Sequence, residues 1–150
     1  MLEDKSKRVS PPAETEAKIG EATVVINYSK PSVKERDIWG ELVPYDKVWR
    51  TGANEATTFE VDKEITVEGK SLKAGKYALF TIPGKEEWTL IFNKEYDQWG
   101  SNDYNVEEDE LRVKVKPTTG DFTEQMTFDI SDNGKVDLRW EELVVSFILK

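Results

Sequence analysis

Residues 126–140 read MTFDISDNGKVDLRW, and this stretch decides the fold class. Apolar side chains occupy every second position in residues 126–130 and again in residues 136–140. A period of two residues is typical of a β-strand with one buried face. The sequence Asp-Asn-Gly (residues 132–134) stands between the two runs and strongly favours a tight turn between antiparallel strands. The stretch therefore predicts a β-hairpin.

Similar patterns recur along most of the chain. Residues 111–116 alternate apolar and basic side chains, and residues 143–149 are apolar at nearly every position. Residues 76–82 are apolar on both faces, which predicts a central strand buried on two sides. Further short strands are predicted at residues 22–28, 57–61, 65–67 and 88–93. About eight to ten short strands without a convincing amphipathic helix predict an all-β, mostly antiparallel fold of the β-sandwich or jelly-roll type.

Two stretches lack a strand period and predict long packed loops. Residues 32–52 carry irregularly spaced aromatic and apolar side chains, and residues 96–110 are polar and acidic. Loops this long within a compact domain are usually functional. Residues 1–12 are polar and contain two adjacent prolines, so we predict a flexible N-terminal arm. Residues 13–150 are predicted to form a single β-sandwich domain.

Composition excludes several classes of function. The formal net charge is −9 and the pI is near 4.7, which argues against nucleic acid or an anionic membrane as a partner. The chain contains no cysteine and no histidine, so thiolate nucleophiles, cysteine zinc sites and Ser-His-acid triads are excluded. No run is long enough for a transmembrane helix, so membrane insertion is not expected. We assign no cofactor, and the sequence leaves the oligomeric state open.

The segment VWRTGANEATTF at residues 48–59 is the strongest candidate for a binding site. An indole can stack on the apolar face of a sugar or ring, whereas a guanidinium, a carboxylate and a carboxamide supply polar contacts. The candidate binding residues are Trp49, Arg50, Asn54 and Glu55. They predict a non-catalytic binding module for a small polar ligand, with a glycan as the first candidate.

Two further tryptophans are candidates for a second wall of that site. Trp39 belongs to the first long loop and Trp99 to the second, so either can line a cleft. A purely structural alternative stays open. In it, Arg50 pairs with Glu55, Trp49 plugs the end of the sandwich, and Gly52 provides a turn with positive φ.

Two other functions stay open at this point. A glycosidase-like hydrolase needs two carboxyl groups, one of which is Glu55 in this interpretation. The partner acid is then Asp37, Glu41 or Asp46, and the sequence does not single out one of them. Alternatively, the chain is a structural or protein-interaction domain that docks a partner through residues 32–52.

The acidic loop carries a partial calcium-binding pattern. Asp103, Asn105 and Glu107 stand at alternate positions, as at the start of a calcium loop. Glu108 occupies the next position, where such a loop has glycine. We therefore interpret residues 97–110 as a solvated acidic loop and assign no metal ligand.

Five blocks of the sequence together resemble a known family. They are RVSPPAETEAKIG (residues 8–20), INYSKPSVKERDIWGELVPYDKVWRTGANEATTF (26–59), AGKYALFTIPG (74–84), WTLIFNKEYDQWG (88–100) and LRWEELVVSFILK (138–150). The family is a bacterial one filed as domain of unknown function 2911. The resemblance runs over residues 8–150, and WRTGANEATT is its most specific block.

The resemblance implies a β-sandwich and no established activity or catalytic residue. Members of this family typically carry a signal peptide ahead of a start like SPPA. The resemblance therefore implies an exported protein, periplasmic or extracellular, whose signal peptide has been removed.

Overall fold

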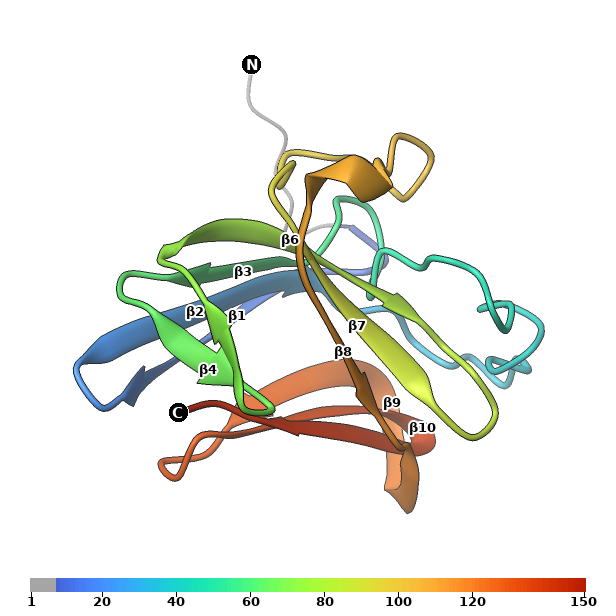
Figure 1. The fold of residues 1–150 in the computed structure, drawn as a ribbon. Coiled ribbons are helices and arrows are strands. Elements are labelled where there is room, and N and C mark those ends of the chain that lie inside the picture. Colours follow the sequence, from blue (N-terminus) through green and yellow to red (C-terminus); the bar gives the residue numbers. More distant parts are fainter. Residues whose placement is uncertain (1–7) are drawn as a thin grey trace.

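The computed structural model describes residues 8–150, and its regular structure is almost entirely β-strand (Figure 1). A short 3-10 helix, η2 (Val106–Glu108), precedes β8. No helix in this part of the chain could cross a membrane. Residues 1–7 of the predicted arm lie outside the described residues. The strands are β1 (Pro12–Ile19), β2 (Ala22–Ser29), β3 (Thr58–Val61), β4 (Ile65–Val67), β5 (Lys70–Leu72), β6 (Gly75–Ile82), β7 (Trp88–Asn93), β8 (Asp109–Val115), β9 (Thr118–Ile130) and β10 (Lys135–Ile148).

The strands form two antiparallel layers. A six-stranded sheet has the order β1-β2-β3-β6-β7-β8, so its neighbours follow one another in the chain except where the β4–β5 hairpin intervenes. The long β9–β10 hairpin lies against one face of this sheet (Figure 1). The end of the chain extends this second layer toward β4. The N–H of Thr66 donates to the carbonyl of Lys150 at 2.6 Å, and Lys150 donates back at 3.0 Å.

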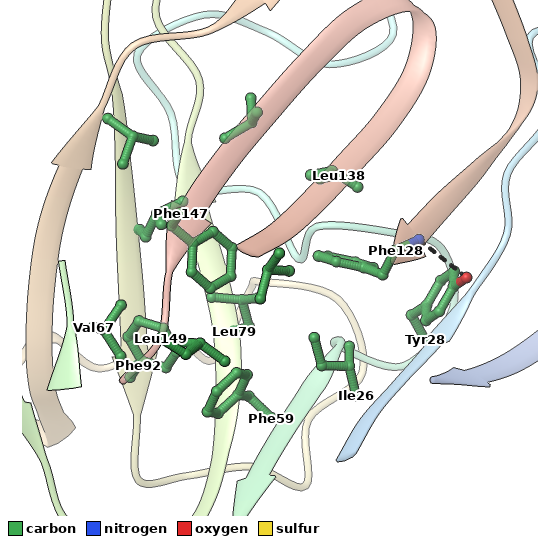
Figure 2. Packing of buried hydrophobic residues seen from close by; sticks show 14 of the residues in the cluster. Ile26, Tyr28, Phe59, Val67, Leu79, Phe92, Phe128, Leu138, Phe147 and Leu149 are labelled. Atoms are coloured by element: carbon green, nitrogen blue, oxygen red, sulfur yellow. Dashed lines mark hydrogen bonds between the residues drawn. The ribbon is translucent and has the colours of Figure 1, made fainter. Parts of the chain in front are cut away.

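Large apolar side chains from both layers meet between them (Figure 2). The six-stranded sheet contributes Phe59, Leu79 and Phe92, and the hairpin contributes Phe128 and Phe147; none is more than 2% exposed. Burying a side chain of this size stabilises the fold by about 1.5–3 kcal/mol. The period of two in the sequence places these residues on the inward faces. The prediction of an all-β, antiparallel fold is confirmed.

The central strand is β6, as the sequence predicts. It pairs with β3 and β7, and its side chains are buried on both faces. One face contributes to the core between the layers. On the other face, Phe80 and Ala78 pack with Ile91 of β7 and with Ala56 from the first long loop.

Four strands differ from the predictions, and one of them is β5, for which no strand is predicted. No strand is predicted over β1. Its outward side chains are exposed, and its inward side chains are only half-buried, except for the buried Ile19 at its end. β9 begins at Thr118, eight positions before the predicted run, because its first half is polar or exposed. β10 is continuous where two strands are predicted: it bends at Glu141, which has φ 59° and lies between two register shifts.

Both long loops are present, and they meet. Residues 30–57 contain no strand, yet Val33, Ile38 and Val43 are buried and anchor this loop to the core. The second loop follows β7, and a β-bridge joins its Trp99 to Glu55 of the first loop. The candidate residues Glu55 and Trp99 therefore lie where the two loops meet.

Candidate functional site

The segment that begins at Trp49 leaves and rejoins the six-stranded sheet. Trp49 pairs with Thr81 of β6 through N–H···O hydrogen bonds of 2.7 and 3.0 Å. Thr57 returns the chain to β6, and its hydroxyl donates to the carbonyl of Thr51 at 2.7 Å. Residues 50–56 bulge out between these anchors. We call them the Arg50 loop.

Left-handed backbone at two residues sets the course of the Arg50 loop. Thr51 and Asn54 both have φ 60°. This conformation is accessible to asparagine but unusual for a β-branched residue. Gly52 lies at φ 159°, so its neighbours make most of the turn that was predicted there. Thr51 is fully buried, and its hydroxyl lies 3.1 Å from that of Thr81.

These turns direct Arg50 and Glu55 to different places. The carboxylate of Glu55 accepts hydrogen bonds from Arg8, with 2.9 Å between Nη1 and Oε2. The side chain of Arg50 makes no hydrogen bond and no ion pair with any residue in the range 8–150. The Arg50–Glu55 pair of the structural alternative is therefore wrong. The amide of Asn54 donates to the carbonyl of Ser10 at 3.2 Å.

Trp39 and Trp49 belong to an aromatic cluster at the end of the core. They pack against each other and against Trp88 and Trp140, with ring centroids 5.3–6.2 Å apart. Trp88 and Trp140 are buried, whereas Trp39 and Trp49 are half-buried. The cluster closes one end of the core, and Trp39 does not form a wall opposite Glu55.

Trp99 lies on the other side of the Arg50 loop and is 62% exposed. Its backbone pairs with Glu55, and the guanidinium of Arg8 lies 5.6 Å from its ring centroid. The preceding residue, Gln98, accepts a hydrogen bond at its carbonyl from the N–H of Ala56 at 2.9 Å. The second loop is thus fastened to the end of the Arg50 loop.

Glu55 lines a hollow of about 460 Å³ between β1, β2 and the second loop. We call it the Glu55 hollow. Its lining carries both charges, and Tyr96 at its edge is 44% exposed. The lining residues are Pro12, Ala13, Asn27, Tyr28, Ser29, Glu55, Ala56, Thr58, Lys76, Tyr96, Asp97 and Gln98.

Arg50 lines a second, smaller cavity of about 230 Å³. We call it the Arg50 cavity. Two arginines and two tryptophans line it, and its lining contains no carboxylate side chain within the described part of the chain. The lining residues are Ser10, Pro31, Arg36, Leu42, Val43, Trp49, Arg50, Gly52, Ala53 and Trp140.

One residue in the lining of each site has a buried polar atom without a hydrogen-bond partner among residues 8–150. For the Glu55 hollow this residue is Gln98, with Oε1 as an acceptor, and for the Arg50 cavity it is Arg50, with Nε as a donor. Burial lowers the pKa of Arg50 from its usual value. The indole nitrogens of Trp39 and Trp88 are also without a partner, but both belong to the tryptophan cluster, where rings pack edge to face.

The acids proposed as hydrolytic partners of Glu55 do not join it. Asp37, Glu41 and Asp46 are absent from the lining of the Glu55 hollow. Asp46 lines a separate hollow beside β7. The second carboxylate of the Glu55 hollow is Asp97.

The acidic loop uses part of its charge for internal contacts. Asp109 accepts hydrogen bonds from Asn93 at 2.9 Å, from the hydroxyl of Tyr104 at 2.6 Å and from Arg112 at 2.8 Å. Burial and the bond to Asp109 raise the pKa of Tyr104. Asn105 caps η2 by accepting from an N–H. Across residues 8–150, no three acidic side chains are grouped so as to hold a metal ion.

Comparison with known proteins gives one match. The model of a family described as a protein of unknown function (DUF2911) matches residues 10–149. The chain belongs to the DUF2911 family. No match was found among curated proteins, and none among solved structures. The resemblance seen in the sequence blocks is therefore confirmed, and the family name assigns no activity.

Several residues of the two sites are not among the sequence candidates. Gln98 and Tyr96 shortly precede the predicted Trp99 in the sequence, so that indole could have drawn attention to them. Arg36 gives no such signal, because it stands among charged residues of a loop. Arg8 lies in the predicted arm, and only the fold brings it to Glu55.

Proposed function

We propose that the protein is a non-catalytic binding module for a small polar ligand, which it takes up in the Glu55 hollow. A polyhydroxylated molecule of the glycan class is the first candidate. One observation carries the proposal. Gln98, whose Oε1 is a buried acceptor without a partner within residues 8–150, lines the hollow together with the exposed Tyr96.

The polar groups of the hollow favour a ligand rich in hydroxyl groups. Leaving a buried acceptor unsatisfied costs about 1–3 kcal/mol, which a ligand hydroxyl can recover. The carboxylate of Asp97 is a further acceptor, whereas Asn27 and Lys76 offer donors. A sugar hydroxyl both donates and accepts, so it can use both kinds of group.

Aromatic side chains beside the hollow support the same ligand class. Tyr96 lines it and is 44% exposed, and Trp99 follows Gln98 directly and is 62% exposed. Exposed rings of this size offer flat apolar faces on which the C–H face of a sugar can stack. Lys76 lies 4.9 Å from the centroid of Tyr96 and orients that ring.

The hydrogen bonds that Glu55 accepts favour binding over hydrolysis. Both of its carboxylate oxygens accept hydrogen bonds from Arg8, so they are engaged in holding the Arg50 loop to residues 8–10. Asp97 shares the hollow, and this keeps a glycosidase-like reaction as the second candidate. If Glu55→Gln and Asp97→Asn each abolished turnover of an aryl glycoside by the wild-type protein, the hydrolase would replace the binding module.

A fluorescence titration tests the binding proposal. Mono- and oligosaccharides are titrated against the wild-type chain, and we expect the emission of the exposed Trp99 to shift to the blue upon binding. Gln98→Met should weaken binding at least about tenfold, because the ligand hydroxyl loses its acceptor. The matched control is Gln125→Met on β9, outside the hollow, which should bind as the wild type does. Absence of a shift with every sugar would refute the glycan proposal.

We also propose a periplasmic or extracellular location, which the family resemblance supports. Fractionation of producing bacteria, followed by detection of the chain with an antibody, tests this. Recovery in the cytosolic fraction alone would contradict it.

A further inference from the structure

The pairing of the arginines distinguishes two of them from the rest. Arg8, Arg112 and Arg139 form ion pairs with Glu55, Asp109 and Asp137, respectively. Arg36 and Arg50 have no acidic partner within residues 8–150, and both line the Arg50 cavity. In a chain of net charge −9, two unpaired guanidinium groups at one cavity form a local positive site.

Arg50 contributes a charge that the protein itself does not balance. Its Nε is buried without a partner, and burial lowers the pKa of its guanidinium. An arginine stays protonated at neutral pH even so, because its usual pKa lies far above neutrality. A half-buried cation without a partner is unfavourable for stability. An anionic ligand would remove that cost.

Arg36 is held in place without being neutralised. Its Nε donates to the carbonyl of Val33 at 3.1 Å, and Nη2 donates to that of Ser32 at 2.6 Å. Backbone carbonyls orient the guanidinium but leave its full charge. Its remaining N–H groups are available at the edge of the cavity.

Aromatic and aliphatic side chains form the apolar part of the cavity wall, beside a larger polar part. Trp49 and Trp140 are stacked, with centroids 6.0 Å apart and an angle of 12° between the planes. Pro31, Leu42 and Val43 complete the wall. At about 230 Å³ the cavity is smaller than the roughly 300–1,000 Å³ of drug-sized sites, so it fits a small molecule.

We infer that the Arg50 cavity is a second site, distinct from the Glu55 hollow, that binds a small organic acid through its carboxylate. The planar fork of a guanidinium matches the two oxygens of a carboxylate. The tryptophans and aliphatic residues accommodate a compact apolar body attached to it. Inorganic phosphate would satisfy the two arginines but would leave the apolar wall without a partner.

The test uses matched pairs of acids and neutral amides, which differ only in charge at one group. Isobutyrate, cyclohexanecarboxylate and their amides are titrated against the Trp99→Phe variant. This variant lacks the exposed indole, so its tryptophan fluorescence comes from the tryptophan cluster. We expect each acid to bind at least about tenfold more tightly than its amide, as for a charge-assisted bidentate contact. Cyclohexanecarboxylate should bind more tightly than isobutyrate, because it buries more apolar area.

Variants assign the signal to the cavity. Arg50→Gln and Arg36→Gln should each weaken binding of the acids at least about tenfold, whereas Arg139→Gln, at a half-buried arginine on β10 outside the cavity, should have no effect. Arg36 is exposed, so its variant tests the site even if Arg50→Gln fails to fold. Equal binding of acid and amide, or an equal loss in Arg139→Gln, would overturn the inference. Phosphate binding as tight as that of cyclohexanecarboxylate would show a general anion site and overturn the carboxylate assignment.

Discussion

The Glu55 hollow and the Arg50 cavity are lined by opposite ends of one short loop, yet they offer opposite chemistry. The hollow presents an unsatisfied acceptor, Gln98, beside two carboxylates. The cavity presents an unsatisfied donor, Arg50, beside a second arginine and no acid among the described residues. Side chains five positions apart therefore serve separate surfaces. Proximity in sequence does not by itself place two side chains in one site.

The backbone of the Arg50 loop explains the separation. Thr51 and Asn54 are left-handed, so the chain turns twice between Arg50 and Glu55. A β-branched residue in this conformation is strained, and such strain persists only where surrounding contacts impose it. Here the hydroxyl of Thr51 contacts that of Thr81, and its carbonyl accepts from Thr57. The strain is the local cost of directing Arg50 and Glu55 to different surfaces.

The largest effect is expected from Gly52→Ala, which should disturb both sites. An added Cβ would lie 3.1 Å from the hydroxyl oxygen of Thr57 and 3.2 Å from the carbonyl of Ser29. Relief of this crowding moves Thr57, whose bond to Thr51 closes the loop. We expect a loss of about 1–3 kcal/mol in the free energy of unfolding, measured in urea.

Gly20→Ala is the control for Gly52→Ala. Its Cβ would meet nothing within 4 Å, and only the left-handed φ of 62° opposes it. We expect it to cost about 1 kcal/mol or less and to leave binding at both sites unchanged. Wild-type binding of sugars and acids by Gly52→Ala would contradict the dependence of both sites on one loop.

The next prediction contrasts an unpaired arginine with a paired one. Arg50→Gln should raise the free energy of unfolding by an amount on the order of 1 kcal/mol, because it removes a half-buried charge without a partner. Arg112→Gln should lower it by about 1 kcal/mol, because Arg112 donates to Asp109 and to Tyr104. Thermal unfolding of both variants and of the wild type shows whether each substitution raises or lowers the stability. A destabilised Arg50→Gln would mean that Arg50 is structural.

Most of the layered fold could be predicted from the sequence, because its strands follow a period of two. The hairpin at residues 126–140, the doubly buried β6 and the two long loops all carry local signals. β1 could not be predicted in this way. Its inward side chains, such as Ala13 and Thr15, are small or polar, and only pairing with β2 defines it as a strand.

The candidate site was harder to predict than the fold. Residue type points to the block around Gly52, but the separation of Arg50 from Glu55 depends on φ angles that glycine usually signals and that Thr51 and Asn54 adopt here. The partner of Glu55 is Arg8, which is 47 positions away. Such a contact depends on tertiary packing, which no local pattern encodes.

The smallest effect concerns pH and the Glu55 hollow. Burial raises the pKa of Tyr28, which lines the hollow and accepts a hydrogen bond from the N–H of Phe128 at 3.1 Å (Figure 2). The folded state therefore holds this proton more tightly than the unfolded state, whose tyrosines titrate near pH 10. The resulting stability is complete below about pH 10 and is lost as the pH rises through the folded-state pKa.

Tyr28→Phe isolates this contribution, because it removes the titrating group and keeps the ring. The variant should be slightly less stable at neutral pH, since the N–H of Phe128 loses its acceptor. Above about pH 10 its stability should fall less steeply than that of the wild type. Melting temperatures between about pH 8 and 11 measure the two slopes. Equal slopes would mean that Tyr28 does not hold its proton more tightly in the folded state. The Arg50 cavity has no tyrosine in its lining, so binding of carboxylates there should not follow this transition.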